Sequence, residues 1–158
     1  MANTQSMCTS FMGELLTATH NFGVAPIRAA TTADTFKAAL YLTSATINAA
    51  TTAYTATGEV SGTNYTAGGV SVTNGNVPAS TNSSATAGVA YWTPSASITY
   101  TTVTLSTAFD TVLIYNSTQS DKAVSVHTFG SQTITAGTFT LTMPSNTTST
   151  ALLRLATT

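Results

Sequence analysis

The stretch FKAALYLTS (36–44) decides the fold class of this chain. Read as an extended strand, it carries Phe36, Ala38, Leu40 and Leu42 on one face and Lys37, Ala39, Tyr41 and Thr43 on the other. An alternation with period two is typical of a strand. The residues after Pro26 are rich in Thr, Val, Ile and Tyr, which favour a pleated surface. The sequence therefore predicts a strand at 36–44 and a β-rich region from Pro26 onward.

Seven further segments have the composition and spacing of strands. They are residues 70–73, 89–93, 98–105, 112–115, 123–129, 138–143 and 151–155. The segments between them are rich in Gly, Pro, Asn and Ser, and PASTNSSATAG (78–88) has no apolar period and is predicted to be an exposed loop. Short strands with frequent turn signals are typical of a sandwich. Residues 26–158 are therefore predicted to form a single antiparallel β-sandwich or jelly-roll-like domain.

The N-terminal segment has the period of a helix. In SMCTSFMGELLTATHNF (6–22), two rows of apolar residues recur every four positions: Met7, Phe11 and Leu15 form the first row, and Cys8, Met12 and Leu16 form the second. This stripe predicts an amphipathic helix over about residues 5–20, and residues 1–25 are predicted to comprise this helix and a linker. A helix with such a stripe needs a surface on which to lie.

Five residues are predicted to dock on a partner. They are Phe11, Leu15 and Leu16 on the helix, and Tyr91 and Trp92 in the strand at 89–93. Aromatic side chains with a polar group are enriched in the cores of interfaces. The same aromatic side chains could instead fill the rim of the chain's own core.

Charge is scarce. Only nine of the 158 residues are charged and the net charge is −1, whereas 37 residues are Thr, 24 Ala and 17 Ser. With so little charge to keep copies apart, the chain is predicted to work bound to other protein, and self-association is expected. Four basic residues supply no field for nucleic acid. No apolar run reaches the ~18 residues of a membrane span, and MANTQSM (1–7) lacks the features of a signal peptide.

The chain offers few groups that could do chemistry. His20 and His127 have no His, Cys or carboxylate at ligand spacing, and Cys8 is the only cysteine. Glu59, in GEVSGTNYTAGG (58–69), has no carboxylate partner in sequence, so it is predicted to accept backbone N–H bonds within a turn. We therefore expect no catalytic residue, no metal site and no cofactor, and a protein that is not an enzyme.

Several sequence blocks resemble a family of small virion proteins of tailed bacteriophages. The blocks are FMGELLTATHNFG (11–23), DTFKAALYL (34–42), GEVSGTNYTAGG (58–69), VLIYNSTQSDKAVSVHTFG (112–130) and SQTITAGTFTLTMPS (131–145). They occur in the order expected for the family, between residues 11 and 145. The resemblance implies a structural component of the virion, assembled in the host cytoplasm, whose partners are the major capsid protein or other virion proteins. It supplies no catalytic residue.

Three functions are compatible with these observations. The first is a head decoration or cement protein that binds the capsid lattice in many copies. The second is a tail-associated structural protein, such as a connector, tube or fibre-base subunit, and copy number per particle would separate it from the first. The third is a module that binds carbohydrate on the host surface, in which Tyr91 and Trp92 would stack on a sugar.

Overall fold

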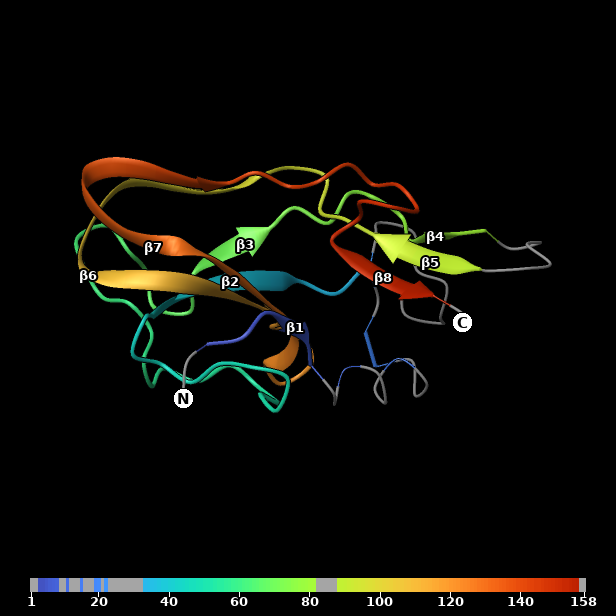
Figure 1. Cartoon of the computed structure of the whole chain (residues 1–158), viewed down its shortest axis with the longest axis horizontal. Helices are drawn as coiled ribbons and strands as arrows, with labels where there is room; N and C mark the ends of the chain where they lie inside the picture. The colour runs from blue at the N-terminus through green and yellow to red at the C-terminus, as the bar shows by residue number, and fades with distance from the viewer. Residues whose placement is uncertain are drawn as a thin grey trace.

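A computed structural model describes residues 3–8, 11, 15, 19–20, 22, 33–81 and 88–156, and within these ranges the chain forms eight strands (Figure 1). The strands are β1 (Ser6–Met7), β2 (Phe36–Leu42), β3 (Val70–Val72), β4 (Ala79–Ser80), β5 (Val89–Trp92), β6 (Ile98–Asn116), β7 (Lys122–Leu141) and β8 (Leu153–Ala156). They form a five-stranded sheet of order β1-β7-β6-β2-β3 and a three-stranded sheet of order β4-β5-β8. All pairings are antiparallel. The predicted fold class, mainly β with a sandwich-like arrangement, is confirmed.

The long β6–β7 hairpin folds back over itself. Tyr100 pairs with Phe139 near its open end, nine residues along β6 from Phe109, which is about 30 Å in a straight strand. The Phe109 and Phe139 rings nevertheless lie 5.2 Å apart, edge to face. The outer half of the hairpin (98–105 with 134–141) therefore lies over the inner half (109–116 with 122–132), and Figure 1 shows both strands turning over into a second layer.

Irregularities in the β6–β7 pairing accompany this bend. The register shifts four times between Tyr100 and Thr111. Thr102 and Ala136 have positive φ values of 51° and 47°. Such bulges bend a strand and increase its twist. The hairpin can therefore fold over without a break in either strand.

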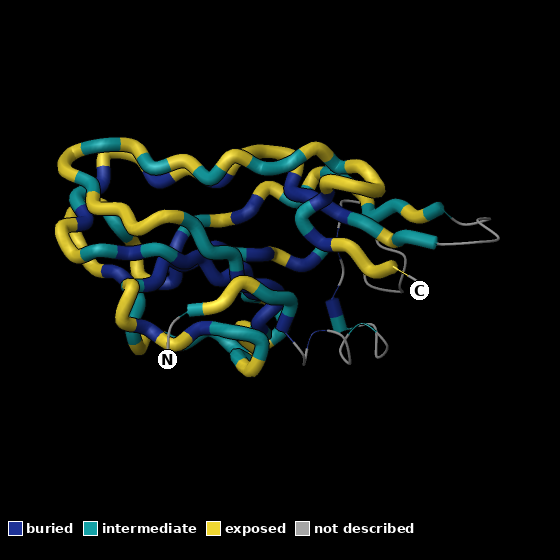
Figure 2. The backbone as a smooth tube through the Cα atoms, in the orientation of Figure 1, coloured by how far each residue is buried: buried dark blue, intermediate teal, exposed yellow. Residues whose placement is uncertain are grey.

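Strand β2 forms the centre of the core because it is covered on both faces. Phe36, Ala38 and Leu40 on one face and Ala39 and Tyr41 on the other are all buried, and Figure 2 shows the dark buried backbone in this region. The outer half of the hairpin covers the first face, where the Tyr100 hydroxyl donates to the carbonyl of Ala38 (2.8 Å). The loop after β2 covers the second face, where the Tyr41 hydroxyl donates to the carbonyl of Thr55 (2.6 Å).

The N-terminal helix predicted over about residues 5–20 is not seen as one element among the residues described there. Ser6 and Met7 instead form β1 on the edge of β7, and the N–H of Cys8 donates to the carbonyl of Val124 (3.1 Å). Phe11 and Leu15 have helical backbone, but their immediate neighbours lie outside the described residues. Of the apolar stripe, Cys8 and Phe11 are buried, Met7 and Leu15 are partly buried, and Met12 and Leu16 lie outside the described residues. The apolar period could not reveal that an open sheet edge would take up the backbone of residues 6–7.

The N-terminal residues share the core of the β-domain. Cys8, Phe11 and Phe22 are buried with the β2 side chains, and the Phe22 ring stacks on Phe36 at 4.5 Å. The predicted division of the chain at residue 25 therefore does not separate two cores among the described residues.

Several predicted strands join into longer ones. The segments predicted at 98–105 and 112–115 are both part of β6, and those at 123–129 and 138–143 fall largely within β7. The segment between these last two predicted strands was expected to be a turn and is not, because Ala136 and Gly137 lie inside β7, where the N–H of Ala136 donates to the Thr104 hydroxyl (3.0 Å). The predicted loop at 78–88 contains β4, and residues 82–87 lie outside the described residues.

Replacing Gly69 by alanine tests the packing of the loop against β2. Gly69 has φ +73°, and a Cβ built there would lie 1.7 Å from the carbonyl oxygen of Ala38. We expect Gly69→Ala to lower the free energy of unfolding by about 2 kcal/mol or more, measured by urea denaturation. Gly130→Ala is the matched control, because a Cβ there meets no atom within 4 Å. Equal losses in the two variants would contradict this account of the loop.

Candidate functional site: an apolar groove

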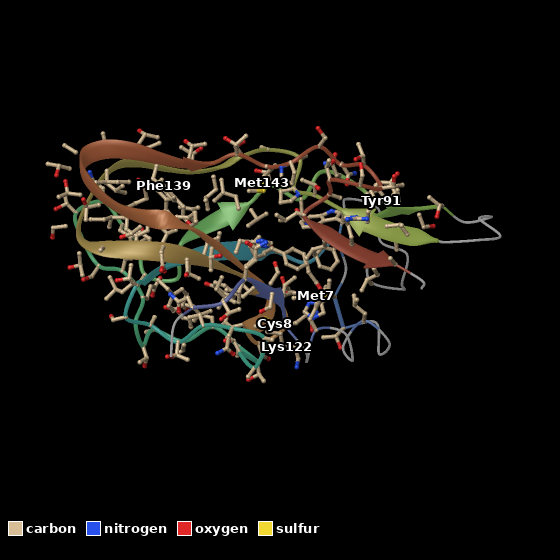
Figure 3. All side chains as sticks on the ribbon, in the orientation of Figure 1. Met7, Cys8, Tyr91, Lys122, Phe139 and Met143 are labelled. Atoms are coloured by element: carbon tan, nitrogen blue, oxygen red, sulfur yellow. The ribbon has the colours of Figure 1, made fainter. Side chains whose placement is uncertain are left out.

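An apolar groove of about 90 Å³ lies between the N-terminal segment and the three-stranded sheet. One wall consists of Met7, Phe11, Leu15 and Phe22, and the other consists of Pro78, Ala90, Tyr91, Trp92, Leu153 and Leu155. Figure 3 labels Met7 and Tyr91, one residue on each wall. None of these lining residues is charged. The groove is therefore suited to an apolar side chain of a partner and offers nothing to an ion.

One face of the β5–β8 pair forms a wall of the groove that is buried at one end and exposed at the other. Trp92 pairs with Leu153, and Ala90 pairs with Leu155, so these four residues share one sheet face. Trp92 is 3% exposed, whereas Leu155 is 42% exposed. The face thus runs from the core at Trp92 to solvent at Leu155.

Four of the five predicted docking residues meet in this groove. Phe11, Leu15, Tyr91 and Trp92 all line it, although about 75 residues separate the two pairs in sequence, and Leu16 lies outside the described residues. Trp92 is buried, which agrees with the alternative that it fills the chain's own core, and Phe11, predicted only to dock on a partner, is buried as well. Leu15 and Tyr91 remain partly exposed and accessible to a partner.

Sequence reasoning missed the other lining residues. Met7 could have been found, because it belongs to the same row as Phe11 and Leu15. Leu153 and Leu155 also carry a signal, since alternate residues of a strand share a face. Phe22, Pro78 and Ala90 carry none, because only the tertiary fold brings them to the groove.

Glu59 is held in a polar cluster. One carboxylate oxygen accepts from the Tyr54 hydroxyl (2.6 Å), and the other accepts from the Tyr65 hydroxyl and the Gly68 N–H (2.8 Å each). The Tyr65 hydroxyl in turn accepts from the N–H of Leu40 in β2 (3.0 Å). The predicted backbone N–H bond to Glu59 is thus present, but the two tyrosine hydroxyls were not predicted. A carboxylate with three donors stabilises this loop.

Burial and the Glu59 carboxylate act in the same direction on the nearby tyrosines. Burial first, and then the hydrogen bond and charge of Glu59, raise the pKa of Tyr54 to about 12. Burial raises the pKa of Tyr65 even further, and its hydrogen bond to Glu59 adds to this increase. Both phenols therefore stay protonated at neutral pH and can keep donating to Glu59.

Replacing Glu59 by glutamine tests this cluster. We expect Glu59→Gln to lower the free energy of unfolding by about 1–3 kcal/mol, because the amide cannot accept from all three donors. Tyr54→Phe is the control, because it removes one donor and keeps the carboxylate, and it should cost less. Thermal and urea denaturation measure both. A Glu59→Gln variant as stable as the unmodified chain would refute a stabilising role.

His20 belongs to a second buried polar cluster. The Asn116 side-chain amide lies 3.0 Å from His20 Nδ1 and donates to one Asp34 carboxylate oxygen (2.8 Å). The Gln119 amide donates to the other Asp34 oxygen (3.2 Å). The His20 ring packs against Phe11 at 4.8 Å and lies 6.2 Å from Phe22. This arrangement links the N-terminal segment to β6 through Asn116.

His127 lies on β7, and its Nε2 is 2.9 Å from the Ser125 hydroxyl oxygen. Burial lowers the pKa of His127 to about 4. Although Ser125 and His127 resemble two members of a hydrolytic triad, Ser125 is itself buried. No third group bonded to His127 is found among the described residues. The pair therefore lacks the access and the partner that nucleophilic catalysis needs.

The pKa of His127 predicts a loss of stability in acid. The unfolded chain binds a proton near pH 6.5 and the folded chain only near pH 4, so stability should fall as the pH decreases through this range. The loss should be on the order of 3 kcal/mol at pH 4. Carboxylates also titrate there, so the measurement is the difference in unfolding free energy between the unmodified chain and His127→Gln. A pH-independent difference would disprove this assignment.

In the described part of the chain, no three His, Cys, Asp or Glu side chains gather closely enough to hold a metal ion. None of the helical segments described has the length and apolarity needed to span a membrane.

Comparisons with protein families, with curated proteins and with solved structures find no match to this chain.

Proposed function

We propose that this protein is a structural component of a tailed-bacteriophage virion. In this proposal it is a head decoration or cement protein that binds the major capsid protein in many copies. The sequence blocks that resemble small virion proteins support the phage assignment. The low charge of the chain, nine charged residues in 158, supports a function in complex with other proteins.

The apolar groove is the observation that carries the proposed mechanism. It is open at Leu155, lined by uncharged residues and continuous with the buried core at Phe11 and Trp92. A capsid subunit would insert an apolar side chain between Leu15 and Leu155. Burial of one such side chain contributes about 1.5–3 kcal/mol, and a lattice of many copies multiplies the contact.

The structural roles of the polar residues support the proposal that this protein acts by binding alone. Glu59 and His20 hold the fold together through hydrogen bonds, and Ser125 beside His127 is buried. Each of these groups therefore has a structural use that does not involve a substrate. The proposed action is to hold neighbouring capsid subunits together.

Removing residues 1–22 is a poor test of this docking. The deletion would remove Cys8, Phe11 and Phe22 from the core, and it would leave Phe36 and Trp92 uncovered. A truncated chain that fails to enter particles could simply be unfolded. A substitution at the exposed end of the groove separates the two effects.

Replacing Leu155 by glutamate is that substitution. Leu155 lines the groove and is largely solvent-exposed, so the variant should fold with a stability change of about 0.5 kcal/mol or less. A charge in an apolar contact should lower incorporation into virions by about tenfold or more. Gln132→Glu, which adds the same charge at an exposed position of β7 that does not line the groove, should incorporate normally.

Quantitative gels of purified virions measure incorporation and also test the assignment to the head. Hundreds of copies per particle are expected for a decoration protein. Six, twelve or a few dozen copies would replace the head assignment with a tail-associated one. Normal incorporation of Leu155→Glu would remove the groove from the mechanism.

A further inference from the structure

A second cavity lies between the two layers of the folded hairpin. It has a volume of about 130 Å³, and its apolar lining includes Ile98, Val112, Ile114, Leu141, Met143 and Leu152. These residues come from both halves of the hairpin and from the segment before β8. An apolar cavity of about 150 Å³ in another protein holds benzene, so this one has room for a single small ring.

One imidazole gives the cavity a polar point. His127 lines the wall, and its Nε2 is engaged by the Ser125 hydroxyl at 2.9 Å. Its other nitrogen, Nδ1, has no hydrogen-bond partner among the described residues. In that part of the chain, Asn146 Oδ1 is the only fully buried side-chain polar atom without a partner, so Nδ1 retains some exposed surface.

The remaining polar side chains of the lining, Thr128 and Thr142, are uncharged. His127 is itself neutral at neutral pH, because burial lowers its pKa. The lining residues would therefore disfavour an ion, which would lose its hydration without gaining a counter-charge. They would accept an apolar body that carries one hydrogen-bonding group.

We infer that this interlayer cavity binds a small, uncharged, ring-sized molecule that packs on Ile98, Ile114 and Leu152 and hydrogen-bonds to Nδ1 of His127. A hydroxyl group suits either tautomer of the imidazole, because it can both donate and accept. The site is distinct from the apolar groove and does not depend on the proposed role in the virion. A phenol is the simplest molecule of this class.

Titration with 4-fluorophenol, followed by ¹⁹F NMR, tests the inference on the full chain. We expect the ¹⁹F signal to show saturable binding with a Kd of about 1 mM. In ¹H NMR spectra of the protein, the bound ring should shift the imidazole signals of His127. Fluorobenzene has the same ring without the hydroxyl and should bind about tenfold more weakly if Nδ1 makes the bond. No saturable binding at 10-fold the expected Kd would overturn the inference.

Two variants locate the site. His127→Phe removes the imidazole, and Leu152→Phe narrows the cavity from the opposite wall, so each should weaken 4-fluorophenol binding by about tenfold or more. Thr133→Ala, at an exposed position of β7 outside the cavity, is the control and should bind normally. Using both walls keeps the test valid if one variant fails to fold. Unchanged binding in a folded variant of either wall would place the molecule elsewhere and refute the inference.

Discussion

The edge-to-face contact between Phe109 and Phe139 brings the two halves of the β6–β7 hairpin together, and most of the fold depends on this arrangement. Phe129 completes the cluster, at 5.9 Å from Phe109 and 5.2 Å from Phe139. With the halves apart, β2 would lose the cover of Tyr100 on one face. The interlayer cavity also exists only because the hairpin closes on itself. A single apolar cluster thus turns a local hairpin into a two-layer domain.

Three tyrosine hydroxyls satisfy backbone carbonyls of the interior. Tyr41, Tyr100 and Tyr115 each donate to a backbone carbonyl, at distances of 2.6–2.8 Å. Such carbonyls lie outside regular pairing or beside it, where a buried acceptor without a donor would be costly. A tyrosine hydroxyl supplies the donor without bringing a charge into the core. This arrangement is consistent with a stable domain that has only nine charged residues.

The sequence predicted the fold class well and the long-range pairing poorly. Period two correctly placed strands at β2, β3 and β5, because each has a local alternation that the sheet preserves. It divided β6 and β7 each into two strands, with breaks at 106–111 and 130–137, and Ala136 in the second break has a positive φ inside β7. In the N-terminal segment the helical period included Cys8 and Phe11, which are buried, but Ser6 and Met7 joined a sheet edge that no local pattern reveals.

The candidate site shows the same division. Phe11, Leu15, Tyr91 and Trp92 could be picked out because they are large, apolar or aromatic, and unusual in a chain of Thr, Ala and Ser. That they meet in one groove depends on the placement of the three-stranded sheet, which sequence alone does not give. For Glu59, the sequence predicted backbone N–H donors but not the two tyrosine hydroxyls. These tyrosines sit five and six residues away in an irregular loop, where no periodicity predicts which side chains converge.

The pairing of β1 with β7 links two segments that are made far apart in time. Ser6 pairs with Val126, and the N–H of Cys8 donates to the carbonyl of Val124, so residues 6–8 leave the ribosome about 120 residues before their partners. Contacts between segments so far apart in sequence are slow to form, because a large loop must close first. A chain interrupted before β7 would lack the strand edge that β1 pairs with, and it would expose Met7 and Phe11 to degradation.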